Sequence, residues 1–278
     1  MQNLHKVMRA RPASAGNAVN RRDWLTLAGT VVAVASRSVQ AQGAPPSGAA
    51  GGVAVASSVQ AAMEVLVPAF SQATGQTLRL TFGASGNLVH QIDQGLPVDL
   101  FLSADEAFAG RLVESGWARD AGAVYATGRL ALVVGRGTAI ALDGRLLGLK
   151  AGWAEVRKFS IANPLLAPYG KAAREALQSA GLWDAAQARL VLGENVAQAA
   201  QFVGTGSAQA GLTALSLVAG RAAALWRDHV AVDGAMHAPL RQRMVLRRQA
   251  GAAATAFYDF LQTPAARAVL QSHGFGPA

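Results

Sequence analysis

Two serine-containing turns stand where a predicted strand is followed by a predicted helix. Ser57 and Ser58 follow the apolar run 52–56, and Ser85 lies in a Gly-Ala-Ser-Gly-Asn turn after the run 78–82. In open α/β sheets, ligands bind beyond the carboxyl ends of the strands, where a helix start presents unpaired N–H groups and the positive end of its dipole. Hydroxyl and N–H groups at such a place can donate hydrogen bonds to a bound anion.

The same residues allow other interpretations. A serine at the end of a strand is also a common helix N-cap, with no role in binding. The string Gly83-Ala84-Ser85-Gly86 faintly resembles the nucleophile elbow of serine hydrolases, but that turn requires a glycine two places after the serine. A hydrolase would also need a histidine held by a carboxylate, and His90 is the local candidate. A serine-dependent hydrolase is therefore an alternative, whereas our expectation is that the chain is not an enzyme.

No combination of residues points to a metal cofactor or to thiol chemistry. The chain has no cysteine, which excludes disulfides, thiolate ligands and a lipoprotein anchor. The string Gly204-x-Gly206 lacks the Gly-Lys-Ser/Thr ending of a phosphate loop. No pair of histidines has metal-ligand spacing among His5, His90, His229, His237 and His273. We expect no cofactor.

Short β-branched runs alternate with amphipathic stretches from residue 52 onwards, which is typical of parallel sheets covered by helices. Strands are predicted at 52–56, 78–82, 98–102, 130–134, 159–162, 210–213, 230–232 and 244–246, and helices at 61–73, 88–94, 171–180, 196–203, 252–261 and 264–273. We expect 52–127 and 227–278 to form one α/β lobe and 128–226 to form the other. Crossovers near Thr127 and Trp226 would make a two-segment hinge, with a ligand cleft between the lobes.

The first 41 residues have the pattern of an export signal peptide. They contain six basic residues and one acid, and their apolar run at 24–36 is too short to span a bilayer. Small residues before and at Ala41 indicate cleavage near that position, and 42–51 has the composition of a flexible linker. The pair Arg21-Arg22 fits a twin-arginine signal, and an ordinary Sec signal fits the same residues. The sequence therefore predicts a periplasmic protein.

Removal of the signal peptide changes the charge of the protein. The whole chain carries a net charge of +9, whereas the 19 basic and 15 acidic residues after residue 41 give +4. Four arginines gather within 241–248, without the interleaved aromatic residues that single-strand binders use. Nucleic acid is therefore not an expected partner.

Several strings of residues occur in a characteristic order between residues 52 and 276. They are Ala-Val-Ala-Ser-Ser at 54–58, Phe-Gly-Ala-Ser-Gly-Asn-Leu at 82–88, Gly-Leu-Pro-Val-Asp-Leu-Phe-Leu-Ser-Ala-Asp at 95–105, Ala-Asn-Pro at 162–164, Ala-Pro-Tyr-Gly at 167–170, Gly-Glu-Asn-Val at 193–196 and Phe-Tyr-Asp-Phe-Leu at 257–261. Together they resemble the substrate-binding proteins of molybdate ABC importers, and the string at 97–105 is the most specific. The resemblance implies a type II periplasmic binding fold, in which two lobes close on an oxyanion.

The resemblance also implies which residues bind the ion. Ser58 and Ser85 match two hydroxyl ligands of the first lobe, with Ser57 beside them. Val196 matches a helix-start residue that provides a main-chain N–H group, and Tyr169 stands in a loop whose backbone contacts the ion.

One feature of the family is missing from this chain. Many members place an anion-contacting tyrosine after a strand that aligns with the string Gly-Leu-Thr-Ala ending at Ala214. Our hypothesis is that the Tyr169 hydroxyl takes the place of that tyrosine.

The ion implied by the resemblance is molybdate or tungstate, which a monomeric receptor would carry to the permease of an ABC importer. Molybdate is a dianion without a proton near pH 7, so its oxygens only accept hydrogen bonds. Phosphate keeps a proton over much of the physiological range and would gain from a carboxylate acceptor, but 57–60 and 83–91 contain no acid. Asp99 and Asp105 belong to the next strand and its exit, and we expect them to form caps or ion pairs.

Two alternatives remain among binding proteins. Sulfate has the charge and shape of molybdate at a smaller size, so a receptor for sulfate or another tetrahedral oxyanion would have similar features. A ligand-sensing domain is the other alternative, although the export signal and the absence of a DNA-binding segment disfavour it.

Overall fold

The computed structural model describes residues 51–219 and 225–278 of the 278-residue chain. The signal peptide expected at 1–41 and the linker expected at 42–51 lie outside the described residues, apart from Gly51. Within the described ranges, no helix is both long enough and apolar enough to cross a membrane.

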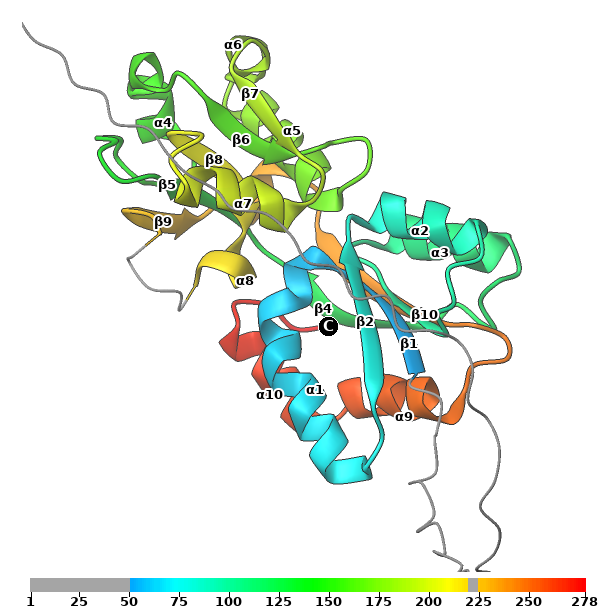
Figure 1. Ribbon diagram of the computed structural model, residues 1–278. Coiled ribbons are helices and arrows are strands. Elements are labelled where there is room, and N and C mark those ends of the chain that lie inside the picture. The colour runs from blue at the N-terminus through cyan, green and yellow to red at the C-terminus, as the bar shows by residue number, and fades with distance from the viewer. Residues whose placement is uncertain (1–50, 220–224) are drawn as a thin grey trace, which may run out of the picture. The chain divides into compact units, whose positions relative to one another are not determined.

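Five strands form the first sheet, in the order β2-β1-β3-β10-β4 (Figure 1). Their bounds are β1 Gly51–Ala56, β2 Leu78–Gly83, β3 Leu100–Leu102, β4 Ala123–Gly128 and β10 Leu240–Leu246. β1 is parallel to β2 and β3, and β10 is antiparallel to β3 and β4. Because β1 and β2 are parallel, their last residues, Ala56 and Gly83, are paired where the carboxyl ends of the strands meet. The turns that carry Ser57 and Ser85 follow directly at these carboxyl ends.

Helices cover both faces of the first sheet (Figure 1). They are α1 Gln60–Thr74, α9 Ala252–Leu261 and α10 Pro264–Ser272 on one face, and α2 Ser85–Asp93 and α3 Glu106–Glu114 on the other. Val53 belongs to the buried cluster of Phe70 and Phe257, whereas the next residue, Ala54, belongs to the cluster of Leu88. Cover on both faces explains why every residue of β1 is buried and why its sequence does not alternate.

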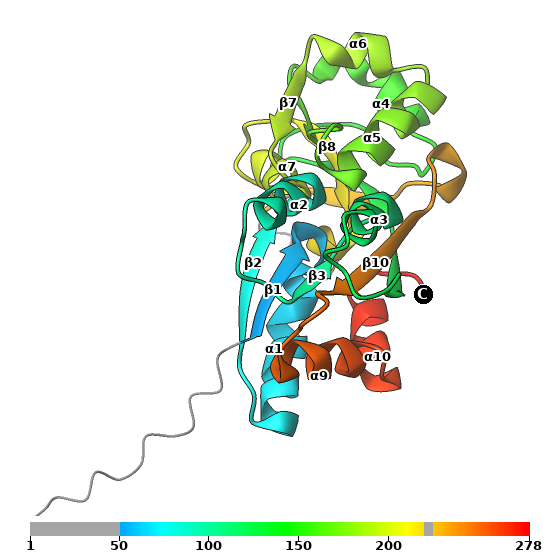
Figure 2. The ribbon, with the colours of Figure 1, turned by 90° about the vertical axis from the view of Figure 1, so that its right-hand side faces the viewer.

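Five further strands form the second sheet, in the order β7-β6-β8-β5-β9. Their bounds are β5 Leu130–Val134, β6 Phe159–Ala162, β7 Leu190–Gly193, β8 Ala210–Ala214 and β9 Asp228–Ala231. α5 Pro168–Ser179 and α7 Val196–Gly204 lie on opposite faces of this sheet (Figure 2). The hydroxyl group of Ser160 in β6 holds α7 by donating to the carbonyl oxygen of Ala199 at 3.0 Å. The remaining short helices are η1 Ser57–Val59, α4 Leu147–Ala151, η2 Trp153–Glu155, α6 Trp183–Gln187, α8 Leu215–Val218 and η3 Gly234–Met236.

The chain passes between the two sheets twice. β4 leads to β5 through Arg129, and β9 leads back to β10 through residues 232–239. Two buried clusters belong to the first sheet and one to the second, and a fourth joins the second sheet to Ala56, Ala84 and Ala104, so the described residues form two α/β lobes in contact. The predicted fold class is confirmed.

Strand β9 corrects the predicted extent of the lobes. The sequence pattern assigns 227–278 to the first lobe, but β9 pairs with β5 of the second sheet, where Ala231 lies opposite Ala131. The return crossover therefore follows Ala231 and not Trp226. Each residue of β9 is half-buried or exposed, and such a short edge strand contains no signal that specifies the sheet it joins.

Candidate functional site

A small cavity is bounded by residues of both lobes. The first lobe contributes Ala56, Ser57, Ser58, Gly83, Ala84, Ser85 and Ala104, and the second contributes Ala167, Pro168, Tyr169 and Val196. All five residues predicted to bind the ligand are therefore brought together in the wall of one cavity: Ser57, Ser58, Ser85, Tyr169 and Val196.

Four helical segments begin at the wall of this cavity. η1 begins at Ser57, α2 at Ser85, α5 at Pro168 and α7 at Val196. The first N–H groups of a helix have no partner within it and carry the positive end of the helix dipole. No side chain caps the first three segments, since the residues before them are Ala56, Ala84 and Ala167. The described wall therefore presents the positive ends of helix dipoles and contains no basic side chain.

The start of α7 fits the main-chain donor expected at Val196. Asn195 caps this helix by accepting hydrogen bonds from the N–H groups of Ala197 and Gln198, at 3.0 and 3.1 Å. The N–H group of Val196 is not among those that Asn195 binds, and Val196 lies in the cavity wall.

Ser85 is buried, and its hydroxyl oxygen accepts a hydrogen bond from the N–H group of Ala104 at 3.0 Å. This bond uses a lone pair of the oxygen and leaves the hydroxyl hydrogen to be donated into the cavity. Ser85 is the first residue of α2 and not its N-cap, which is Ala84. The interpretation of Ser85 as a helix cap is therefore wrong.

Ser58 is joined to side chains from both lobes. The Nε2 atom of Gln242 lies 3.1 Å from the hydroxyl oxygen of Tyr169 and 3.5 Å from that of Ser58. The Tyr169 hydroxyl is also hydrogen-bonded to the Ser58 side chain and to the backbone of Arg129. Burial raises the pKa of Tyr169 well above its usual value of 10, so the phenol keeps its proton at neutral pH.

Gln242 and Tyr125 are parts of the site that the sequence analysis missed. The Tyr125 hydroxyl donates to the Oε1 atom of Gln242 at 2.8 Å, and both side chains are buried. Gln242 does have a sequence signal. It stands at every-second-residue spacing between Leu240 and Met244, and all three side chains are buried in β10. Tyr125 lies in β4, a strand that the sequence pattern did not predict.

The described wall of the cavity contains no carboxylate. Asp105 accepts a hydrogen bond from the N–H group of Phe108 at 2.9 Å and so caps α3. Asp99 lies 3.4 Å from Arg247 as an ion pair and accepts a hydrogen bond from the N–H group of Gly251 at 3.1 Å. The expectation that both acids form caps or ion pairs is confirmed.

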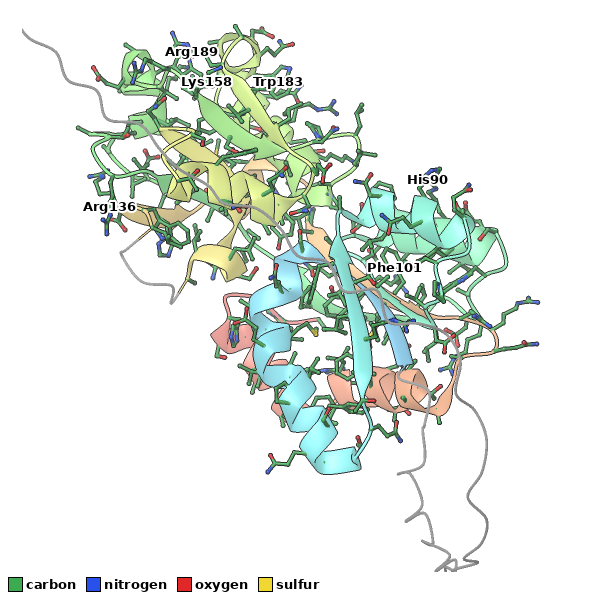
Figure 3. All side chains as sticks on the ribbon, viewed as in Figure 1. His90, Phe101, Arg136, Lys158, Trp183 and Arg189 are labelled. Carbon is green, nitrogen blue, oxygen red and sulfur yellow. The ribbon has the colours of Figure 1, made fainter. Side chains whose placement is uncertain are left out.

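The described wall contains no histidine either, and His90 is exposed on α2 (Figure 3). Ser85 therefore has no adjacent base of the kind that a hydrolase uses. In the ranges that the structure covers, no group of three or more His, Cys, Asp or Glu side chains could hold a metal ion. The wall offers hydrogen-bond donors and apolar groups, which is the chemistry of a binding site for an anion.

Comparison with known proteins identifies the family. Residues 52–276 match the family model described as bacterial extracellular solute-binding protein, and the chain belongs to this family.

Within that family, the chain is similar to molybdate-binding proteins. The molybdate-binding protein ModA of Azotobacter vinelandii is 35% identical over 227 residues, which cover 81% of this chain and 88% of the relative. ModA of Rhodobacter capsulatus is 35% identical over 210 residues, which cover 74% of this chain and 80% of the relative. The solved structure of the Azotobacter vinelandii periplasmic molybdate-binding protein matches with a TM-score of 0.74 at 29% identity, covering 82% of this chain and 99% of that chain. The resemblance to substrate-binding proteins of molybdate importers is confirmed.

Proposed function

We propose that this protein captures molybdate or tungstate in the cavity between its lobes and delivers the ion to the permease of an ABC importer. The observation that carries this proposal is the composition of the wall, which contains serine hydroxyls and helix starts from both lobes and no carboxylate among the described residues. The names of the relatives as molybdate-binding proteins support the choice of ion.

A fully deprotonated oxyanion suits such a wall because each of its oxygens accepts hydrogen bonds and none donates. A hydrogen bond to a charged group contributes roughly 1.5–3 kcal/mol. About half a dozen of them, less the cost of ordering, reach the roughly −8 kcal/mol of a micromolar site. A protonated phosphate would find no carboxylate to accept its hydrogen in the described wall, so we expect the site to reject it.

In this proposal, Ser58 and Ser85 donate to the ion through their hydroxyl groups, and Tyr169 and Val196 donate through main-chain N–H groups. Ser57 contributes at the start of η1. The Tyr169 hydroxyl oxygen already accepts a hydrogen bond from the Nε2 atom of Gln242 at 3.1 Å, so in this proposal Tyr169 contacts the ion through its main chain in place of the direct hydroxyl contact first supposed.

The protein acts in this proposal as a monomeric periplasmic carrier and not as an enzyme, with the two crossovers as its hinge and no nucleic-acid partner. The relatives are binding proteins, which supports the role of a carrier. The pattern of an export signal at 1–41 and the modest net charge of +4 after it support the location and the absence of a nucleic-acid partner.

A thermal-shift screen against molybdate, tungstate, sulfate, phosphate and chromate tests the proposed function. A ligand at a hundred times its Kd stabilises the folded state by about 2.7 kcal/mol. For a domain of this size, that corresponds to a rise in Tm of roughly 5 °C or more. We expect this rise for molybdate and tungstate, and no rise for phosphate. A larger rise with sulfate, or none with molybdate, would contradict the proposal.

A further inference from the structure

Two buried hydroxyl groups near the end of β8 bind the main chain of residues in the cavity wall. The Thr213 hydroxyl donates to the carbonyl oxygen of Val196 at 3.0 Å, and the Ser216 hydroxyl donates to that of Ser58 at 2.7 Å. Thr213 and Ser58 are fully buried, and only 2% of Ser216 is exposed. A carbonyl group has no hydrogen to give, so the hydroxyl is the donor in both bonds. The end of β8 therefore holds one wall residue in each lobe.

The bond from Ser216 crosses from the second lobe to the first. Ser216 belongs to α8, which follows β8, whereas Ser58 belongs to η1, which follows β1. α8 packs against both η1 and α1 (Figure 1). Because the acceptor is a main-chain atom, this bond fixes the backbone of Ser58 relative to the second lobe. Ser216 does not line the described cavity wall, so it acts on the ion through the residue that it binds.

Helix α8 begins beside the first crossover. The N–H group of Leu215, the first residue of α8, donates to the carbonyl oxygen of Arg129 at 2.8 Å. Arg129 is the residue between β4 and β5, where the chain enters the second lobe. Atoms close to a hinge move least when two lobes rotate about it. The bond from Ser216 can therefore be kept in both the open and the closed protein.

The bond from Ser216 also has an energetic reason. A buried carbonyl oxygen left without a donor raises the free energy of the folded state, so η1 would shift to bring the Ser58 oxygen to another partner. Such a shift would move the side chain of Ser58 as well. A donor group that is held in place before the ion arrives loses less entropy on binding, which increases the affinity.

We propose that Ser216 is a positioning residue for oxyanion binding, which holds the main chain of Ser58 from the opposite lobe so that the Ser58 side chain meets the ion. This inference rests on the proposed function of the cavity. It adds a residue of α8 to a site whose helix starts belong to η1, α2, α5 and α7.

The bond itself can be tested by nuclear magnetic resonance without a ligand. In the full-length protein, we expect Ser216→Ala to shift the carbonyl carbon resonance of Ser58 upfield, because a carbonyl carbon becomes more shielded when its oxygen loses a hydrogen-bond donor. An unchanged resonance would show that the bond is absent in solution and would overturn the inference, whether or not molybdate binds.

The effect on binding is tested by titration calorimetry with molybdate. We expect Ser216→Ala to raise Kd about tenfold, near the lower value of one hydrogen bond to a charged group. In a Ser58→Ala background the same substitution should leave Kd unchanged, because no hydroxyl remains to be positioned. The loss of stability should be the same in both backgrounds, since the acceptor is a main-chain oxygen that Ser58→Ala retains. An equal rise in Kd in both backgrounds, or no rise in either, would overturn the inference.

Ser160→Ala is a matched control. Ser160 is also buried, and its hydroxyl donates to the carbonyl oxygen of Ala199 at 3.0 Å, within one lobe and away from the cavity wall. This variant should bind molybdate with the Kd of the parent. Should Ser216→Ala fail to fold, Ser216→Cys replaces the hydroxyl by a weak donor of similar size, and the same dependence on Ser58 is expected. Loss of molybdate binding by the unmodified protein would instead contradict the proposed function alone.

Discussion

Ser85 and Ser58 share a property that distinguishes them from ordinary surface serines. Each hydroxyl oxygen already has a donor, which is the N–H group of Ala104 at 3.0 Å for Ser85 and the Nε2 atom of Gln242 at 3.5 Å for Ser58. What each hydroxyl can still offer to the cavity is a hydrogen. At the scale of residues, two features favour an ion that only accepts hydrogen bonds. The serine hydroxyls offer hydrogens to the cavity, and the described wall lacks carboxylates.

Ser85→Ala should weaken molybdate binding by about 10- to 100-fold, because one hydrogen bond to a charged group is lost. The free energy of unfolding should also fall, by roughly 1–3 kcal/mol, since the buried N–H group of Ala104 loses its acceptor. Calorimetry gives the affinity and urea denaturation the stability.

Ser160→Ala is the matched control for this prediction. Ser160 is equally buried, and its hydroxyl donates to the carbonyl oxygen of Ala199 away from the cavity wall. It should reduce stability and leave the affinity unchanged. If Ser85→Ala bound molybdate as tightly as the parent, Ser85 would not be a donor to the ion.

The two serine turns could be found from the sequence because a serine between a strand and a helix is a local pattern. Tyr125 could not, since its role depends on a hydrogen bond to Gln242, 117 positions away in the sequence. Gln242 showed itself only as a polar residue on the buried face of a strand, which indicates burial but not its partner.

At the scale of elements, a hydrogen bond from α2 joins the lobes across the cavity. The N–H group of Gly86 in α2 donates to the carbonyl oxygen of Leu166, which precedes α5, at 2.9 Å. A Cβ atom on Gly86 would lie 2.9 Å from that same oxygen. The absence of a side chain at residue 86 therefore allows the two helix starts to approach.

Gly86→Ala should lower the affinity for molybdate, because the added methyl group keeps the lobes from reaching this arrangement. Calorimetry measures the effect, and about a tenfold rise in Kd is expected for one lost closing contact. Gly110→Ala in α3 is the control. A Cβ atom there would meet nothing within 4 Å, so this variant should gain up to about 1 kcal/mol of stability with no change in affinity. Equal affinities for the two variants would contradict the closing role of Gly86.

An ion pair attaches α3 to β10. Glu106 at the start of α3 binds Arg241 at 3.0 Å and also pairs with Arg243, and the hydrogen bond from Arg243 lowers the pKa of Glu106 below its usual value of 4.5. A lowered pKa means that this carboxylate adds stability above about pH 4.5 and loses it as the pH falls through the lowered value.

Glu106→Gln should therefore be less stable than the parent at pH 7 and equally stable at pH values well below 4.5. The difference at pH 7 should be about 1 kcal/mol or less, because the pair is exposed enough for water to screen it. Urea denaturation at several pH values measures it. A difference that grows on acidification would contradict the assignment.

Elements with a strong local pattern were predicted with their bounds, as at Leu130–Val134, Phe159–Ala162 and Ala252–Leu261. β4 was missed because its residues, Ala-Val-Tyr-Ala-Thr-Gly, have few β-branched side chains and a mixed pattern of burial. It becomes a strand by pairing with β10, a tertiary contact that overrides weak local propensity.

At the scale of the whole molecule, the ligand site depends on which strands share a sheet. β1, β2 and β3 present their carboxyl ends together, and the chain enters and leaves the second lobe through two crossovers. The pattern of the sequence indicated two lobes and a hinge, but the sheet that β9 joins is decided by the open edge of β5, which no local pattern contains. Topology was predictable in outline, and the pairing of edge strands was not.

The central claim is that neutral donors from two lobes hold an ion that has no proton. Because the described cavity wall holds no acid, histidine or basic side chain, molybdate binding should neither take up nor release protons. Titration calorimetry from about pH 6 to pH 9, in buffers with different ionisation enthalpies, measures this directly. The account predicts a constant Kd and no proton transfer across that range. A Kd that changes about tenfold for each pH unit, with matching proton uptake, would show a titrating group at the ion and contradict it.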